Sequence, residues 1–334
     1  DDGVIFISID DNEVDNLKKI CNEVFGEDNF IAKLTIINNL KGNNDQFAFA
    51  GTHEYALVYC KFYNLADVHE IYMSADEIDD WEEDEFGLFK RGANLKATGI
   101  NAPREKRPNL FFPIYIDENL NFFLDRKFNS REVIPITNGK EMSWRWSKSK
   151  FLSEKHNVII IENKGEYSIY KKQRNNDDEK PTKKPKSAFM KPEYSSGNGS
   201  SMMKKLFDSK VFDFPKSIEL VKDFVCVGSR ESDIILDFFS GSSTTAHAVM
   251  QLNAEDGGNR KFIMVQLPEH TDEKSEAYKA GYMNICEIGK ERIRRAGEKI
   301  KEENKDKENI ENLDIGFKVL KLDTSNIRKW QPDY

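Results

Sequence analysis

The sequence predicts an α/β fold in which a mostly parallel sheet is interrupted by an inserted module. Short continuous apolar runs, typical of strands covered on both faces, alternate with helical periodicity near both ends of the chain. The middle of the chain, residues 67–200, is instead irregular and rich in aromatic side chains. With 334 residues, the chain is long enough to form two domains.

Residues 1–66 are expected to form one strand–helix unit followed by a hairpin. Residues 3–10 (GVIFISID) form a continuous apolar run, and residues 10–26 carry apolar side chains at helical spacing. Strand-like segments follow at 30–38 and 54–62. Because a buried strand seldom opens a domain, we expect this part to be the remainder of a larger sheet whose first portion lies upstream.

Residues 67–200 are expected to form an inserted α+β domain. Residues 74–87 resemble an acidic helix, and short aromatic-rich strands follow. Residues 171–191 contain eight Lys and Arg against three acidic residues. This composition indicates a solvated loop. A more specific alternative is that the segment contacts nucleic-acid phosphates.

The sheet pattern returns in residues 201–334. A proline-started helix is expected at 212–225, a strand at 233–239, a helix at 243–253 and a second strand at 261–267. A long amphipathic helix at 282–304 and a last strand at 313–323 complete the prediction.

Composition sets limits on the class of protein. The net charge of −8 argues mildly against a nucleic-acid partner, although an average can hide a local basic face. The four cysteines are scattered without metal-ligand spacing, which favours free thiols in a reducing cytoplasm. No apolar run approaches the roughly 20 residues of a membrane span.

The most informative stretch is DFFSGSSTTAHAVM, residues 237–250. A tight turn between a strand and a helix is its simplest interpretation. Asp237 ends the strand, however, where its carboxylate can accept a hydrogen bond from a ligand ammonium group, and the helix N-terminus that follows favours an anion. Gln266 and Glu269 follow Gly241 by 25 and 28 residues, near the offset at which such folds bind a ribose.

Two common ligands do not fit this stretch. A phosphate-binding P-loop needs a lysine that is absent here, and Ser243 and Ala246 stand where a dinucleotide-binding motif has glycine. A ligand with an amino-acid head and a ribose but no phosphate fits better, and S-adenosylmethionine has that form.

The same stretch resembles the cofactor motif of DNA methyltransferases that methylate amino groups, usually D-x-F-x-G-S-G-T-T. Residues 212–225 (FDFPKSIELVKDFV) resemble the segment that lines their cofactor, in the order of the permuted, beta-type arrangement. Residues 3–32, 52–61, 284–296 and 316–326 resemble the modification subunits of type III restriction systems. Ser243 departs from the motif, since the family has a second glycine there.

The resemblance implies a permuted, Rossmann-like S-adenosylmethionine-dependent methyltransferase fold, incomplete at its N-terminus. It implies methylation of adenine in double-stranded DNA, a restriction (helicase and nuclease) subunit as partner, and a homodimeric intact protein. The cofactor-binding residues that it implies are Phe214, Pro215, Lys216, Asp237, Phe238, Phe239, Gly241, Ser243, Thr244, Thr245, Gln266 and Glu269.

The catalytic tetrapeptide that the resemblance implies, [D/N/S]-P-P-[Y/F/W], is missing. None of the ten prolines is adjacent to another. In the family this motif precedes the strand that begins at residue 3, so we expect it upstream and assign no catalytic residue here. A DNA-binding specificity module with a vestigial cofactor pocket therefore stands as the alternative to an enzyme.

The expected DNA contacts lie in the insert. Trp144 and Trp146 alternate with Arg145, so the two rings share one face; a core position and base stacking are both open for them. The basic segment adds three candidates for phosphate contacts. These are Lys183, Lys184 and Lys186.

Overall fold

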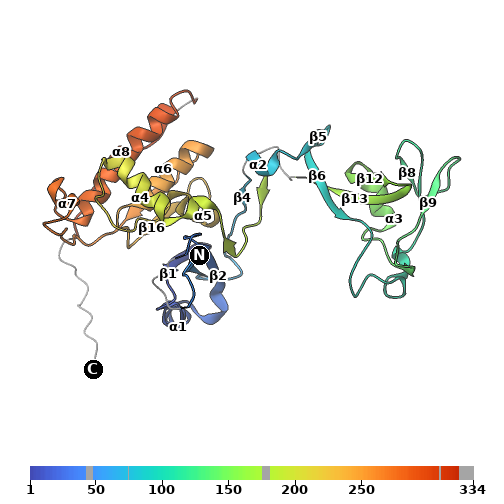
Figure 1. The fold of residues 1–334 in the computed structure, drawn as a ribbon, viewed down its shortest axis with the longest axis horizontal. Helices are drawn as coiled ribbons and strands as arrows, with labels where there is room; N and C mark the ends of the chain where they lie inside the picture. Colours follow the sequence, from blue (N-terminus) through green and yellow to red (C-terminus); the bar gives the residue numbers. More distant parts are fainter. Residues whose placement is uncertain (43–47, 74, 175–180, 308–309, 323–334) are drawn as a thin grey trace. The chain divides into compact units, whose positions relative to one another are not determined.

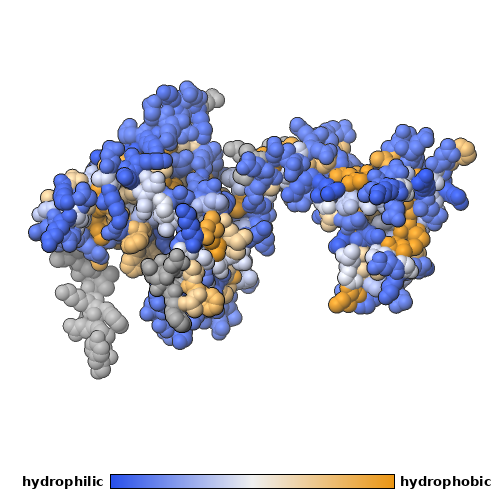
Figure 2. All heavy atoms as spheres, in the orientation of Figure 1, coloured by the Kyte–Doolittle hydropathy of each residue, from blue (hydrophilic) through white to orange (hydrophobic). Residues whose placement is uncertain are grey.

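The computed structural model describes residues 1–42, 48–73, 75–174, 181–307 and 310–322. The chain divides into two compact units, residues 1–71 with 184–334 (unit 1) and residues 72–183 (unit 2). Unit 2 is narrower than the predicted insert of 67–200, because residues 184–200 pack with unit 1. Hydrophilic residues cover most of the visible surface, with hydrophobic patches on both units (Figure 2). No helix in these ranges is long and apolar enough to cross a membrane.

The first part of unit 1 is a small sheet with one helix. Its strand order is β1-β3-β2-β15; β3 is antiparallel to both neighbours, and β15 is parallel to β2. The expected strand–helix unit and hairpin are therefore confirmed (Figure 1). The bounds are β1 Val4–Ile9, α1 Val14–Phe25, β2 Phe30–Ile37, β3 His53–Cys60 and β15 Ala188–Phe189.

The second part of unit 1 contains a pair of parallel strands, β16 and β17. Helix α6 connects them, as in a β-α-β unit, and α5 packs on α6. On one side of α5, Phe224 stacks on Phe6 of β1; on another, Val225 packs with Val249 of α6 and with Ile235 of β16. Helix α5 thus links the two sheets. The bounds are α5 Ile218–Gly228, β16 Ile234–Asp237, α6 Thr244–Asp256 and β17 Lys261–Met264.

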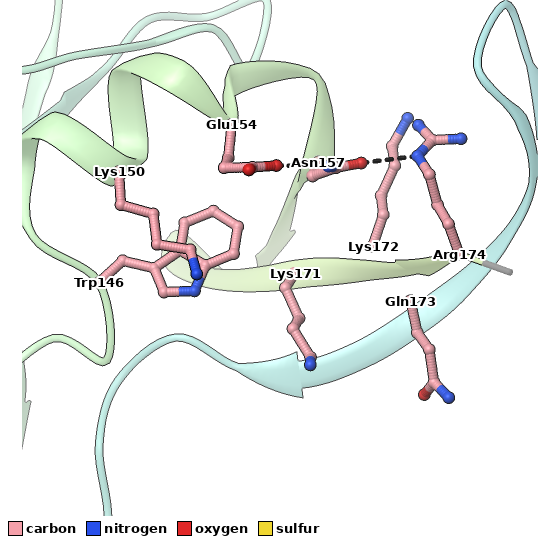
Figure 3. Close-up of a pocket in the computed structure, with 8 residues that line it drawn as sticks. All are labelled: Trp146, Lys150, Glu154, Asn157, Lys171, Lys172, Gln173 and Arg174. Carbon is pink, nitrogen blue, oxygen red and sulfur yellow. Dashed lines mark hydrogen bonds between the residues drawn. The ribbon is translucent and has the colours of Figure 1, made fainter. Parts of the chain in front are cut away.

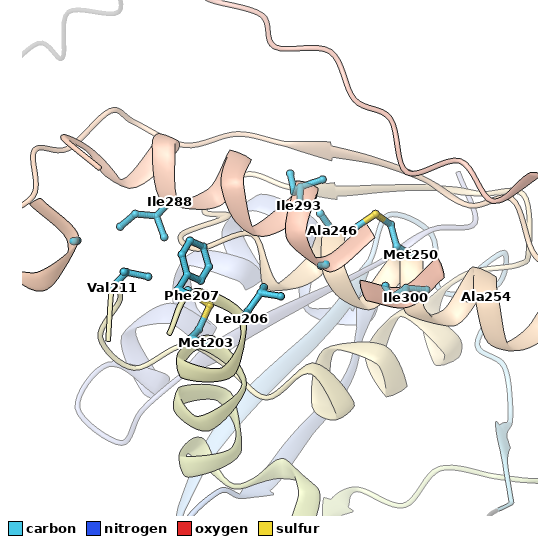
Figure 4. Close-up of a cluster of buried hydrophobic side chains, with 12 residues drawn as sticks. Met203, Leu206, Phe207, Val211, Ala246, Met250, Ala254, Ile288, Ile293 and Ile300 are labelled. Carbon is cyan, nitrogen blue, oxygen red and sulfur yellow. The ribbon is translucent and has the colours of Figure 1, made fainter. Parts of the chain in front are cut away.

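A helical layer supports α6. Helix α8 (Ile285–Glu303) packs against α6 and α4 (Ser196–Phe207), and α7 (Glu276–Lys279) precedes it. The shared core includes Met203, Phe207, Met250, Ile293 and Ile300, all nearly inaccessible to solvent (Figure 4).

One face of the β16–β17 pair is uncovered in this structure. Ile234, Leu236 and Ile263 point away from α5 and α6 and are 66%, 57% and 51% exposed, while Ile235 and Phe262 pack toward the helices. Neither β16 nor β1 has a second neighbouring strand among the described residues. Exposed apolar patches of this kind are typical of surfaces that bind a ligand or another protein surface.

Unit 2 is built on an antiparallel sheet of order β12-β13-β6-β5 and a three-stranded sheet of order β8-β7-β9. Its core surrounds Trp144, Phe151 and Ile169. The principal bounds are β5 Glu82–Asp84, β6 Gly87–Asn94, β7 Ile114–Ile116, β8 Phe122–Phe123, β9 Arg131–Val133, α3 Lys148–Ser153, β12 Val158–Asn163 and β13 Glu166–Arg174. The remaining short elements are β4 Ile71–Tyr72, α2 Ala75–Ile78, β10 Ile136–Thr137, β11 Lys140–Glu141 and β14 Thr182–Lys183.

Three predicted elements differ from the structure. The acidic helix at 74–87 is reduced to α2, and the following Glu82–Asp84 pairs with β6 as a strand. The helix predicted from 212 begins only at Ile218, because residue 214 adopts a positive φ that a helix does not allow. No strand forms in 313–322, and residue 323 lies outside the described residues. Part of the basic run, 175–180, also lies outside them.

Candidate functional site

The loop between β16 and α6 has a defined backbone conformation. Gly241 and Ser243 both adopt positive φ, 51° and 60°. Ser243 is the N-cap of α6 and makes no side-chain cap. A left-handed conformation costs a residue with a Cβ roughly 1–2 kcal/mol. This backbone explains why a glycine suits the position of Ser243, and it leaves the first amides of α6 without a capping side chain.

Asp237 holds the two ends of this loop. Its Oδ1 accepts from the backbone N–H of Phe239 at 3.1 Å, and its Oδ2 accepts from Thr245 Oγ1 at 2.5 Å. The carboxylate is half-buried, and each oxygen keeps a lone pair. Asp237 can therefore fix the loop and still accept from a ligand donor.

Gln266 also holds the loop. Its Oε1 accepts from the N–H of Gly241 at 2.7 Å, and its Nε2 donates to the carbonyl of Leu267. Gln266 thus positions the loop, while its amide keeps a second hydrogen and a second lone pair, so its expected contact with a ribose stays a prediction. The Glu269 side chain is exposed and has no hydrogen bond to another described residue.

Residues 214–216 line a separate cavity and follow Phe212, which lies next to the loop. Phe214, Pro215 and Lys216 line a cavity of about 200 Å³, and Lys216 forms an ion pair with Glu54. The loop does not line this cavity. Phe212, two residues before Phe214, lies next to the loop, because its ring is 3.4 Å from the place where a Cβ on Gly241 would be.

Two aromatic side chains extend from the loop. Phe238 is 48% exposed and Phe239 is 84% exposed, with ring centroids 5.3 Å apart. They contribute to the uncovered apolar surface.

Helix α8 approaches the loop from behind, a feature that the sequence did not reveal. Gly289 permits this approach, since a Cβ there would lie 2.6 Å from Ser243 Oγ. Arg292 is fully buried, and its Nη1 donates to Ser242 Oγ at 2.8 Å and to Thr244 Oγ1 at 2.7 Å. Burial lowers the pKa of Arg292 to about 9.

His247, on α6, is a buried helix residue. Burial and the nearby cation of Arg292 lower its pKa to about 3, so the imidazole is neutral at physiological pH. We assign it no catalytic role.

In unit 2 the two tryptophans share a face, as their alternation predicted. Both rings pack edge-on against Phe151, at centroid distances of 6.0 Å for Trp144 and 5.5 Å for Trp146. Trp144 is 2% exposed and donates through Nε1 to the carbonyl of Phe112. Its ring has no surface on which a base can stack, so the expectation of DNA contact is wrong for Trp144. Arg145 is exposed and bonds to the Asn94 carbonyl.

Trp146 lines a cavity of about 350 Å³ with a cationic lining (Figure 3). Lys150 lies over its ring at 5.4 Å, while Lys172 and Arg174 both bind Asp84. These pairings lower the pKa of Asp84 and partly neutralise the cavity. The lining residues are Trp146, Lys150, Glu154, Asn157, Lys171, Lys172, Gln173 and Arg174.

The predicted lysines do not form one cluster with the tryptophans. Lys183 belongs to β14 and pairs with Glu77. Lys184 and Lys186 fall in unit 1 by the division of the chain, and both have exposed side chains.

Comparison with known proteins identifies the family. A model of the DNA methylase family matches residues 1–298. The chain belongs to the DNA methylase family. This membership supports an α/β methyltransferase fold.

Several curated DNA methylase relatives are similar to the chain. The EcoPI Mod subunit of a type III restriction-modification enzyme, from Escherichia phage P1, is 43% identical over 96% of this chain and 50% of the relative. The EcoP15I Mod subunit of Escherichia coli is 31% identical over 96% and 50%, respectively. The type II methyltransferase M.KpnI of Klebsiella pneumoniae is 31% identical over 86% and 68%. The chain spans about half the length of the type III subunits it matches.

Proposed function

We propose that this chain is part of the modification subunit of a type III restriction-modification system. The complete protein transfers a methyl group from S-adenosylmethionine to the exocyclic amine of adenine in a specific double-stranded DNA site. Family membership over residues 1–298 and 43% identity to a type III Mod subunit support this proposal.

The observation that carries the cofactor assignment is the loop from Asp237 to Thr245. It combines a half-buried carboxylate with the uncapped N-terminus of a 13-residue helix. In the proposal Asp237 accepts from the ammonium group of the cofactor, the first amides of α6 bind its carboxylate, and Glu269 accepts from its ribose. Phe238 and Phe239 supply apolar surface for the adenine.

The fold proposed for the complete protein is the permuted Rossmann-like arrangement with an inserted target-recognition domain. Its support is the chain order, in which β1–β3 precede unit 2 and β16–α6–β17 follow it. The uncovered face of β16–β17 agrees with a further segment of the same protein that packs there. We assign the catalytic tetrapeptide to that segment.

The chemistry divides between the two parts. The bound cofactor supplies an electrophilic methyl group on sulfur. This chain fixes the cofactor through the loop, and the further segment holds the target amine in line with the methyl group. The adenine amine is conjugated with its ring and weakly nucleophilic, so it needs hydrogen-bond acceptors from that segment.

Target recognition is assigned to unit 2. Lys150, Lys171 and Arg145 are exposed or half-exposed cations that can contact phosphates, and Trp146 borders the same region. The proposed partners are double-stranded DNA, a second copy of the subunit and a restriction subunit. A cytoplasmic location is part of the proposal, because the proposed substrate is DNA.

The cofactor assignment is tested by calorimetry with S-adenosylmethionine and S-adenosylhomocysteine. Replacing Asp237 by Ala removes a charge-assisted hydrogen bond of about 1.5–3 kcal/mol, so affinity is expected to fall about 10-fold to 100-fold. Glu302→Ala, at an exposed carboxylate paired with Lys305 near the end of α8, is the control and leaves affinity unchanged.

Equal affinities of wild type and Asp237→Ala would contradict the proposal that Asp237 binds the ammonium group of the cofactor. Absence of binding by the wild-type chain and by the complete protein favours the alternative, a DNA-binding specificity module with a vestigial pocket. Its supporting observation is that no two prolines are adjacent, so the catalytic tetrapeptide is missing from these 334 residues.

A further inference from the structure

Arg292 carries a buried charge that no carboxylate neutralises. The side chain is fully inaccessible, and no ion pair to it forms among the described residues. Its Nε and Nη2 have no hydrogen-bond partner there. An uncompensated buried cation costs several kcal/mol, so its retention in the core calls for a compensating interaction.

The remaining guanidinium nitrogen points to where that interaction lies. Nη1 donates to the hydroxyl oxygens of Ser242 and Thr244, in the loop that precedes α6. Each hydroxyl accepts from Arg292, so its own hydrogen is directed away from the guanidinium. Neither hydroxyl donates to another described residue.

The same loop ends in an uncapped helix. Helix α6 has 13 residues, and Ser243 gives it no side-chain cap. The first backbone N–H groups of the helix are potential anion donors, and the hydroxyls of Ser242 and Thr244, which are 2% and 7% exposed, connect this end of α6 to Arg292. Met250 of α6 and Ile293 of α8 belong to the same buried cluster (Figure 4).

We propose that Arg292 is the positioning residue for the carboxylate of the cofactor. It orients the hydroxyls of Ser242 and Thr244 toward the carboxylate, and its positive charge is compensated when the carboxylate binds. Arg292 does not touch the ligand. It acts through the loop, and Gly289 allows α8 to come close enough. This inference rests on the proposed function, because it takes the ligand to be S-adenosylmethionine.

The test compares three adenosyl ligands that differ in their amino-acid part. S-adenosylhomocysteine carries the carboxylate, decarboxylated S-adenosylhomocysteine lacks only the carboxylate, and methylthioadenosine lacks the whole amino-acid head. Calorimetry is done with wild type, Arg292→Met, and the control Arg294→Met. Arg294 lies on the same helix but is exposed and pairs with Glu291.

Arg292→Met is expected to weaken S-adenosylhomocysteine about tenfold and to change the other two ligands less than twofold. Arg294→Met changes none of them. Ser242→Ala, which keeps the buried cation and removes one oriented hydroxyl, is expected to weaken only S-adenosylhomocysteine, by about threefold. This second variant keeps the test valid if Arg292→Met does not fold.

An equal loss of affinity for all three ligands overturns the inference, since a merely structural Arg292 affects them alike. An unchanged affinity for S-adenosylhomocysteine overturns it too. Both results leave the proposed function standing if the wild type binds. Failure of both the wild-type chain and the complete protein to bind any of the three overturns the proposed function, and the inference with it.

Discussion

Residues 1–334 alone are expected to transfer no methyl group to DNA, whereas the complete protein transfers it. The loop from Asp237 to Thr245 offers groups that we propose bind the cofactor, but these 334 residues contain no adjacent Pro-Pro-aromatic motif to localise the lone pair of the adenine amine. Positioning of the two reacting groups contributes as much as about 7–11 kcal/mol to such reactions. Without the motif that positions the adenine amine, the rate of methyl transfer is therefore expected to fall to background.

The assay uses methyl-tritiated S-adenosylmethionine and DNA of mixed sequence, with the complete protein measured alongside. Digestion of the labelled DNA to nucleosides identifies the product, which is expected to be methylated on the adenine amine. Methyl transfer by residues 1–334 would contradict the assignment of the catalytic motif to a further segment. Label on cytosine carbon in the complete protein would contradict the proposed reaction.

The second large effect concerns the uncovered face of β16 and β17. The double variant Leu236→Thr with Ile263→Thr is expected to destabilise the complete protein by about 2–4 kcal/mol, because burial of a large aliphatic side chain contributes about 1.5–3 kcal/mol. In residues 1–334 the same change is expected to cost less than about 1 kcal/mol, since both side chains are more than half exposed there. Urea unfolding of both proteins measures the difference.

Ile235→Ala provides the matched control on the opposite face of the same strand. Its side chain packs with Val225 and Val249 between α5 and α6, so it destabilises both proteins. A double variant with the same small effect in both would show that no further segment covers Leu236 and Ile263.

Local sequence patterns predicted the elements whose hydrophobic faces are regular. The first strand and helix, the hairpin of β2 and β3, and the unit β16–α6–β17 were all anticipated from periodicity. The loop after Asp237 was anticipated from its small residues. These features depend on residues that are close together in the sequence, so the local hydrophobic pattern predicts them.

Features that depend on distant residues were not anticipated. Arg292 reaches the loop across 50 positions; its spacing of four from Ile288 and from Ala296 places it on the buried face of α8, but spacing does not identify its partner. The hydrogen bond between the Gln266 side chain and the Gly241 N–H was not predicted, because the number of residues between them does not show where the side chain points. For Trp144, alternation fixed the shared face but could not decide between core and surface, which tertiary packing decides.

The central claim, that S-adenosylmethionine binds at the loop between β16 and α6, is tested most directly by hydrogen–deuterium exchange with and without saturating S-adenosylhomocysteine. We expect protection at the backbone amides of 238–246 and of 212–217, because the ligand covers these segments and stabilises the turn. Residues 75–174 of unit 2 are expected to exchange at the same rate with and without the ligand. Protection confined to unit 2, or no change at 238–246 under conditions where calorimetry shows binding, would contradict the location of the cofactor site.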